Sequence, residues 1–170
     1  MHLQAKRIAV CSMTAATGVV LLLLGAVLGL GIYACPLLVG LCLMPIGKQY
    51  GVRYQLLLWA AISVLSLLLV PDVEETFLFA GLFGWYPALY PKLQRLPRLL
   101  RLMVKLLLFN VVIVAVEALA MLVLAPEAVA GAMLAVLLIL GNVTFLLYDA
   151  VIPRFERLAD KYGKRLFDRL

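Results

Sequence analysis

Two carboxylates, Glu117 and Asp149, interrupt long apolar stretches of the sequence. Ionisable side chains inside such stretches are costly to bury, so they are candidates for ligand binding or for ion pairing. In a cavity open to the outside, Glu117 would favour a solute that carries positive charge or several hydrogen-bond donors. The alternative is a protonated Glu117 that bonds to a backbone carbonyl or reaches the membrane interface.

Polar residues also occur at matching depths on either side of a predicted tight turn near Pro126. Antiparallel positions across this turn place Lys105 opposite Asp149 and Asn110 opposite Asn142. We expect the first pair to form a structural ion pair near the inner membrane interface. The asparagine pair fits interhelical hydrogen bonding or, together with the glutamate described above, the lining of a solute-binding site.

Other residues that could support catalysis or bind a metal are scarce. His2 is the single histidine, and no His-Glu-x-x-His, Gly-x-Ser-x-Gly or Cys-x-x-Cys motif occurs. The stretch from Gly40 to Lys48 has the wrong spacing for a phosphate-binding loop, and Gln49 stands where that loop needs Ser or Thr. We therefore expect no enzymatic activity, no metal and no cofactor. Three cysteines form no close pair and are expected in the packed core: Cys11, Cys35 and Cys42.

The composition indicates whether water or lipid surrounds this chain. Of its 170 residues, 66% are hydrophobic and 14% are charged, and the mean hydropathy is +1.11. A soluble domain carries about 45–50% apolar and about 25% charged residues. Lipid must therefore cover much of the surface, which excludes a cytosolic enzyme, a nucleic-acid-binding module and a secreted disulfide scaffold.

The apolar runs predict an all-α, polytopic membrane protein, because none of them shows the alternation of a strand. A membrane-spanning helix needs about 20 apolar residues, or fewer where the membrane thins. Six transmembrane helices are predicted, at about residues 5–31, 32–46, 54–70, 76–90, 99–125 and 128–152. Residues 1–152 would form the membrane domain, and residues 153–170 a short, basic, amphipathic cytoplasmic helix.

The charges predict the orientation of these helices. All 15 Lys and Arg residues lie at the start of span one, after span six, between spans two and three, or between span four and the first turns of span five. With six crossings and both termini inside, every basic residue faces the cytoplasm, as the positive-inside rule requires. The acidic residues Asp72, Glu74, Glu75 and Glu127 would lie at the outer mouth. We expect a multi-pass protein of the cell membrane, specifically a bacterial inner membrane, with its basic surface against anionic lipids rather than nucleic acid.

Small residues recur along the first predicted span at intervals of four: Ala5 with Ala9, Ser12 with Ala16, and Gly25 with Gly29. In lipid, such faces let two helices approach closely. The partner would be another helix of this chain or a second protein.

Together, these features resemble the substrate-binding S components of energy-coupling-factor vitamin importers. The resemblance covers size, the six-span topology with both ends inside, the small-residue first helix and the short, irregular middle spans. Local likeness to uncharacterised S-component-like bacterial membrane proteins is closest over Pro36 to Gly51 and Phe83-Gly84-Trp85-Tyr86-Pro87.

The resemblance implies an outward-facing solute pocket and partner subunits. In that family an Ala-x-x-x-Ala face on the first helix docks on a transmembrane coupling subunit, which works with ATPase subunits. Ala5 and Ala9 match the form of that face, and Ser12 and Ala16 are a degenerate alternative. No residue set identifies the solute.

Two other functions remain open from the sequence. A membrane scaffold or assembly protein would expose its small-residue face and enclose no cavity. A lipid-handling protein, whether an enzyme or a flippase, would use the basic loop from Lys92 to Lys105 to contact phosphates. Glu117 and Asp149 are expected about two helical turns apart in depth, which counts against an intramembrane enzyme.

Overall fold

The computed structural model describes the backbone of residues 2–29, 33–124 and 131–169, and side chains within 4–29, 33–116, 118–119 and 138–158. All regular structure in these residues is helical, which confirms the predicted all-α class. The elements are α1 (His2–Leu28), α2 (Ala34–Tyr50), α3 (Val52–Leu69), α4 (Val73–Leu78), the π-helix η1 (Phe79–Phe83), α5 (Tyr86–Leu93), α6 (Arg98–Leu124) and α7 (Gly131–Arg169).

Four helices in the described part of the chain are long and apolar enough to cross a membrane. The qualifying stretches are Gln4–Leu28 in α1, Val52–Leu69 in α3, Arg98–Val116 in α6 and Leu138–Leu158 in α7. The second predicted span forms α2, which has only 17 residues. The fourth is divided among α4, η1 and α5. The structure thus supports a membrane protein with four candidate spans.

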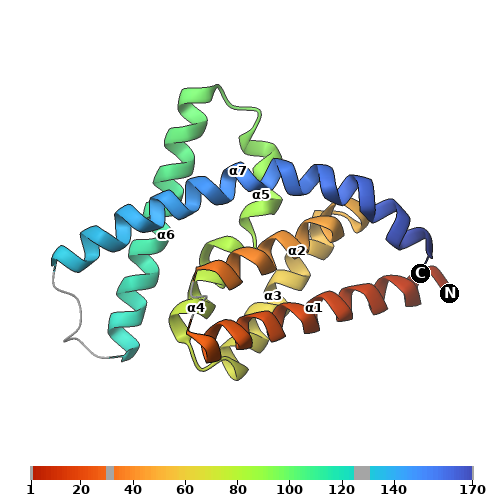
Figure 1. Cartoon of the computed structure of the whole chain (residues 1–170), viewed down its shortest axis with the longest axis horizontal. Helices are drawn as coiled ribbons and strands as arrows, with labels where there is room; N and C mark the ends of the chain where they lie inside the picture. The colour runs from red at the N-terminus through yellow and green to blue at the C-terminus, as the bar shows by residue number, and fades with distance from the viewer. Residues whose placement is uncertain (1, 30–32, 125–130, 170) are drawn as a thin grey trace.

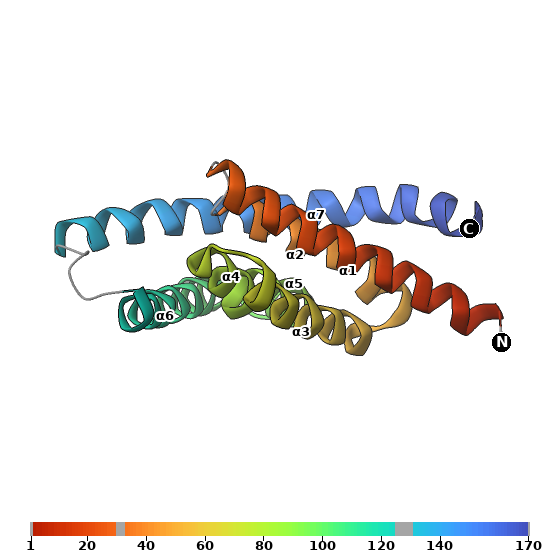
Figure 2. The same cartoon turned by 90° about the horizontal axis from the view of Figure 1, so that it is seen from below.

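Helix α2 lies at the centre of the fold, in contact with α1, α3, α5, η1 and α7. Two clusters of buried side chains meet at its faces. The first cluster includes Val39 and Leu43 of α2 and joins it to α1 and α3. The second includes Leu41 and Met44 and joins it to α5, α6 and α7. Seen from below, α6, α5, α4 and α3 form one layer, and α7 lies on the opposite side (Figure 2).

The predicted fourth span is irregular because it contains a π-turn. The amide of Gly84 donates to the carbonyl of Phe79 over 2.9 Å, five residues back. Side chains then take up carbonyls along this stretch: Trp59 Nε1 donates to Ala80 at 3.1 Å and Trp85 Nε1 to Gly81 at 2.7 Å. Broken helices are tolerated at membrane depth where protein groups satisfy the freed carbonyls in this way.

The last helix departs from its predicted boundary. The backbone of α7 stays helical through Pro153 as far as Arg169, so the predicted separate tail forms the second part of one long helix. A proline inside a helix removes one hydrogen bond and favours a kink, but tertiary context can retain the helix. Here, Ile152 is fully buried beside Pro153, and Lys48 Nζ of α2 lies 3.7 Å from Glu156 Oε1 beyond it.

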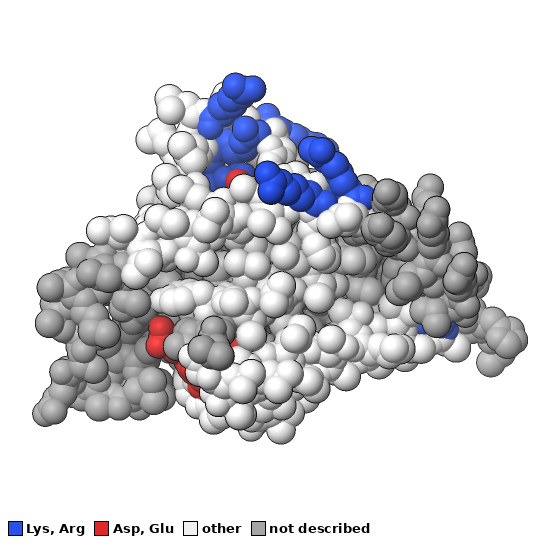
Figure 3. All heavy atoms as spheres, viewed as in Figure 1, with Lys and Arg blue, Asp and Glu red and all other residues white. Residues whose placement is uncertain are grey.

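Charge is unevenly distributed over the surface. Figure 3 shows Lys and Arg gathered over the neighbouring ends of α5 and α6 and over α7, while Asp and Glu appear near α4 at the opposite edge. This separation agrees with the basic and acidic ends that the sequence predicts.

Candidate functional site

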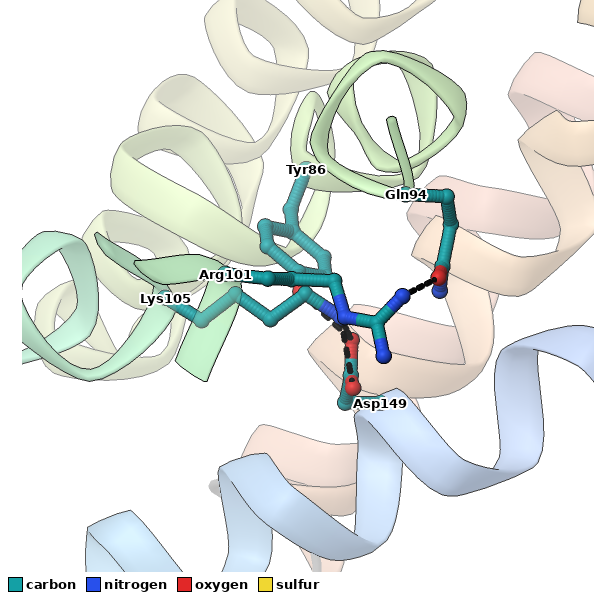
Figure 4. A network of polar contacts seen from close by, with 5 residues as sticks. All are labelled: Tyr86, Gln94, Arg101, Lys105 and Asp149. Carbon is teal, nitrogen blue, oxygen red and sulfur yellow. Dashed lines mark hydrogen bonds and ion pairs between the residues drawn. The ribbon is translucent and has the colours of Figure 1, made fainter. Parts of the chain in front are cut away.

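A buried ion pair connects α6 to α7 and holds α5 against them (Figure 4). Lys105 Nζ lies 2.6 Å from Asp149 Oδ1 and 2.7 Å from Oδ2. The Tyr86 hydroxyl donates to the same Oδ1 over 2.6 Å. The Lys105 side chain is only 3% exposed, and its ammonium lies 4.7 Å from the centre of the Tyr90 ring. The pair that the sequence spacing predicts is therefore formed, and three helices share it.

This network is closed by groups of the chain itself. The Asp149 carboxylate receives hydrogen bonds from two donors, and Arg101 donates to Gln94 Oε1 at the exposed rim. The Asp149 side chain is 22% exposed, but a ligand there would compete with Lys105 and Tyr86 for the carboxylate oxygens. The geometry therefore favours anchoring of helices over chemistry on a solute.

The two predicted asparagines form a reciprocal pair. Asn110 Nδ2 donates to Asn142 Oδ1 over 3.1 Å, and Asn142 Nδ2 donates to Asn110 Oδ1 over 3.0 Å. Each amide also donates to a carbonyl of its own helix, at Leu106 and Leu138. The interhelical bond is thus present, and a role for this pair in solute binding remains a prediction.

The predicted solute contact Glu117 belongs to α6, but its side chain lies outside the described residues. Glu127 lies outside them entirely. The described parts of α6 and α7 cross steeply rather than run side by side (Figure 1). The proposed role of Glu117 therefore stays a prediction.

The structure places a buried carboxyl where the sequence analysis expected an exposed one. Glu75 was assigned to the outer mouth, yet it is 0% exposed, and neither Oε1 nor Oε2 has a hydrogen-bond partner. A Cβ built on Gly25 would overlap Glu75 Oε1 and lie 2.8 Å from Cys35 Sγ. The carboxyl therefore occupies the space that the missing side chain of Gly25 leaves between α1 and α2.

A periodic signal could have found this carboxyl. Glu75 lies four residues before Phe79 and seven before Leu82, and all three are buried. Helical periodicity from these apolar residues places Glu75 on the core face and Glu74 off it. The acidic composition of the loop instead favours an exposed position for Glu75, because Glu is almost never fully buried without a partner.

Burial affects the ionisation of Glu75. Loss of water around the carboxyl, followed by the nearby negative charge of Asp72, raises its pKa from 4.5 to about 7. Asp72 itself caps α4, since its Oδ1 accepts the Glu75 amide over 3.1 Å. Asp72 and Glu75, three residues apart, thus differ in role: Asp72 caps the helix, and Glu75 packs in the core.

An apolar groove of about 650 Å³ lies between α2 and α7. It begins at Gly29, at the end of α1, and Tyr33 and Ala34, where α2 starts. Along α7 it passes Thr144 and Tyr148, whose hydroxyl donates to the Phe83 carbonyl over 3.2 Å. Its walls are otherwise aliphatic: Leu37, Leu38, Leu147 and Val151.

The predicted docking residues lie on an open face of α1. Ala5, Ala9, Ser12 and Ala16 are all exposed. Next to this face, a second groove of about 470 Å³ separates α1 from α3, with Ser12 and Tyr54 among its lining residues. The described helices of this chain thus leave the face uncovered, and a docking role for it stays a prediction.

No group of His, Cys, Asp and Glu within the described residues has the arrangement of a metal site. The chain matches no protein-family model, no curated protein and no solved structure.

Proposed function

We propose that this chain is the solute-binding membrane subunit of an importer for a vitamin or another small solute, energised by partner ATPase subunits. The observation that carries the proposal is the groove between α2 and α7. Its volume of about 650 Å³ lies within the range of about 300–1,000 Å³ typical of small-molecule sites. Its lining is mostly aliphatic with few polar residues, which also fits that pattern.

The orientation proposed for the chain places the mouth of this groove outside. In a six-span topology with both termini inside, the junction of α1 and α2 faces the exterior, and the groove begins there, at Gly29 and Tyr33. The acidic residues near α4 lie on the same side and would attract a cationic or donor-rich solute. The basic face in Figure 3 would lie against the cytoplasmic leaflet of a cell membrane.

The exposed small-residue face of α1 supports a partner helix. Ala5, Ala9, Ser12 and Ala16 lie free of the other described helices, and small residues permit close helix packing in lipid. We assign this face to a transmembrane coupling subunit, through which ATPase subunits would act.

Native mass spectrometry of the protein, extracted gently from its own membrane, tests the proposal. The expected result is a complex with a coupling subunit and two ATPases, or the chain with a small-molecule adduct. Leu38→Trp places a large ring in the groove and should abolish the adduct. Leu65→Trp is the matched control, since Leu65 on α3 is comparably exposed, at 41% against 47% for Leu38, and lies outside the groove.

A lipid-handling function is the second candidate, because the same groove is open and largely apolar. An acyl chain would fit such walls, and the basic ends of α5 and α6 would suit a lipid phosphate. A phospholipid or polyprenyl phosphate adduct that Leu38→Trp removes would favour this candidate over the importer. The chain alone, or bound to an unrelated membrane complex without an adduct, would instead favour a scaffold.

A further inference from the structure

Glu75 lies where four helices meet, in a site with no counter-charge among the described residues. Gly25 of α1 and Cys35 of α2 form the wall against its carboxyl, and α4 also contacts α3. Both carboxyl oxygens are buried and have no hydrogen-bond partner. An unpaired carboxylate in such a site is strongly disfavoured, whereas a protonated carboxyl is neutral.

The described side chains of the surrounding elements offer no positive charge that could stabilise the ionised form. Helix α6 also packs against α4 and carries Glu117, whose side chain lies outside the described residues. The outer parts of α1 (residues 17–28) and α3 (residues 60–69) contain no charged residue, and neither does η1. The Cys35 thiol is the titratable group that α2 brings to the site. From the start of α4, Asp72 adds negative charge, which opposes ionisation further.

The short helix α4 is the element that carries Glu75. It has six residues, and the π-turn η1, a type of irregularity often found at functional sites, follows it directly. Outward movement of α4 would bring the Glu75 carboxyl to the acidic surface and into water.

We propose that Glu75 is a proton-binding site of the outer end: its protonated form packs α4 against α1 and α2, and loss of the proton releases α4 and increases the exposure of the half-buried Cys35 thiol. The carboxyl holds the proton on Oε1 or Oε2 in the packed state and gives it to water on release. The site takes a proton as its ligand and needs no solute, so the inference is independent of the proposed function. The raised pKa of Glu75, about 7, places the transition near neutral pH.

Thiol labelling tests the proposal, because Cys35 lies against the site and the chain carries its own references. The full chain in lipid nanodiscs is labelled briefly with N-ethylmaleimide at pH 5.5 and at pH 8.5, and mass spectrometry quantifies each cysteine. Cys11 and Cys42 report the ordinary rise in thiolate with pH. The ratio of Cys35 to Cys11 labelling should rise at least about tenfold between the two pH values, since each pH unit above the pKa changes the ionised-to-protonated ratio tenfold.

Two variants separate Glu75 from its neighbour. Glu75→Gln keeps the shape and stays neutral, so its labelling ratio should remain at the low value across the pH range. Glu74→Gln alters the adjacent, half-buried carboxylate and should behave as the wild type. A constant ratio in the wild-type protein, or a rise that persists in Glu75→Gln, would overturn the proposal.

Infrared spectroscopy of the wild-type protein provides a test that does not depend on the variant folding. A protonated carboxyl has a carbonyl stretching band that a carboxylate lacks. We expect such a band at pH 5.5, lost near neutral pH with the same midpoint as the labelling change. Absence of this band at pH 5.5 would mean that Glu75 is ionised in the folded protein, which would contradict the inference.

Discussion

The two core clusters on either side of α2 differ in whether their buried polar side chains have hydrogen-bond partners. In the cluster formed with α5, α6 and α7, the Asp149 carboxylate is bonded to Lys105 and Tyr86, and the two asparagines bond to each other. Five buried side-chain atoms in the described structure have no partner, and all belong to α3 and α4: Gln55 Nε2, Ser63 Oγ, Ser66 Oγ, Glu75 Oε1 and Glu75 Oε2.

This difference predicts that the region around Lys105 and Asp149 keeps one arrangement, whereas the region around Glu75 changes with its surroundings. A satisfied polar network in a low-dielectric interior holds its members in one arrangement. A buried group without a partner gains from a change that brings it water, a proton or a ligand. We therefore expect changes in the network to affect folding, and changes near Glu75 to affect the response to pH.

The largest expected effect comes from breaking the buried ion pair. Asp149→Leu leaves the Lys105 ammonium buried without its counter-charge, which should destabilise the protein by about 3–5 kcal/mol. Thermal unfolding in detergent, followed by size-exclusion chromatography, measures the loss. The double variant Lys105→Met/Asp149→Leu should recover most of the stability, because an apolar pair of similar volume replaces the charges. Equal losses in the single and double variants would show that packing, rather than charge, dominates there.

A smaller effect is expected from filling the space beside Glu75. In Gly25→Ala the new methyl group would overlap Glu75 Oε1 and crowd Cys35 Sγ. Overpacking costs about 1–3 kcal/mol, against about 1 kcal/mol gained in helix propensity, so a net loss of up to about 2 kcal/mol is expected in thermal unfolding.

Two further variants control this result. Gly81→Ala is milder, since its Cβ would lie 3.1 Å from the Val112 side chain, and it should leave the stability nearly unchanged. Adding Glu75→Ala to Gly25→Ala removes the overlap and should reduce the loss. If the double variant is no more stable than Gly25→Ala, the overlap with Glu75 does not cause the effect.

The pH dependence of stability should distinguish Glu75 from the paired groups. Its pKa is about 7 in the folded protein and 4.5 ordinarily. Between these values the folded state holds a proton that the unfolded state releases, so this contribution to stability falls as the pH rises from 4.5 to 7. As the pH rises across this range, the melting temperature of the wild-type protein should therefore fall relative to that of Glu75→Gln. A pH-independent difference would assign a lower pKa to Glu75.

The smallest effect is expected at the asparagine pair. Interhelical hydrogen bonds between polar side chains in membrane proteins contribute about 0.6 kcal/mol on average. A double-mutant cycle with Asn110→Ala and Asn142→Ala should give a coupling energy of this size. A coupling energy near zero would leave the pair free for the solute-binding role that the sequence suggests.

Local rules explain what the sequence predicts well. The apolar runs predict helices because each side chain carries its own preference for lipid or core. The sequence predicts the pairs Lys105–Asp149 and Asn110–Asn142 from antiparallel positions about a single turn. The structure contains both contacts, although α6 and α7 cross steeply (Figure 1).

The features that the sequence analysis missed depend on distant parts of the chain. Glu75 is buried because Gly25, fifty residues earlier, leaves it room. The π-turn holds its carbonyls through Trp59 of α3 and Tyr148 of α7. The helix α7 continues through Pro153, and Lys48 of α2 pairs with Glu156 beyond that point. Helical periodicity places Glu75 on the core face of α4, but no local pattern predicts these contacts with distant residues.

The central position of α2 has a consequence for the order in which the protein assembles during synthesis. A Cβ on Gly40 would lie 2.8 Å from the Tyr148 hydroxyl, so this face of α2 closes against α7. Helix α7 is made after α2, and its Tyr148 follows Gly40 by more than one hundred residues. Until then, one face of the 17-residue helix α2 has no protein packed against it. A chain whose synthesis stops before α7 therefore lacks the packing that completes the core.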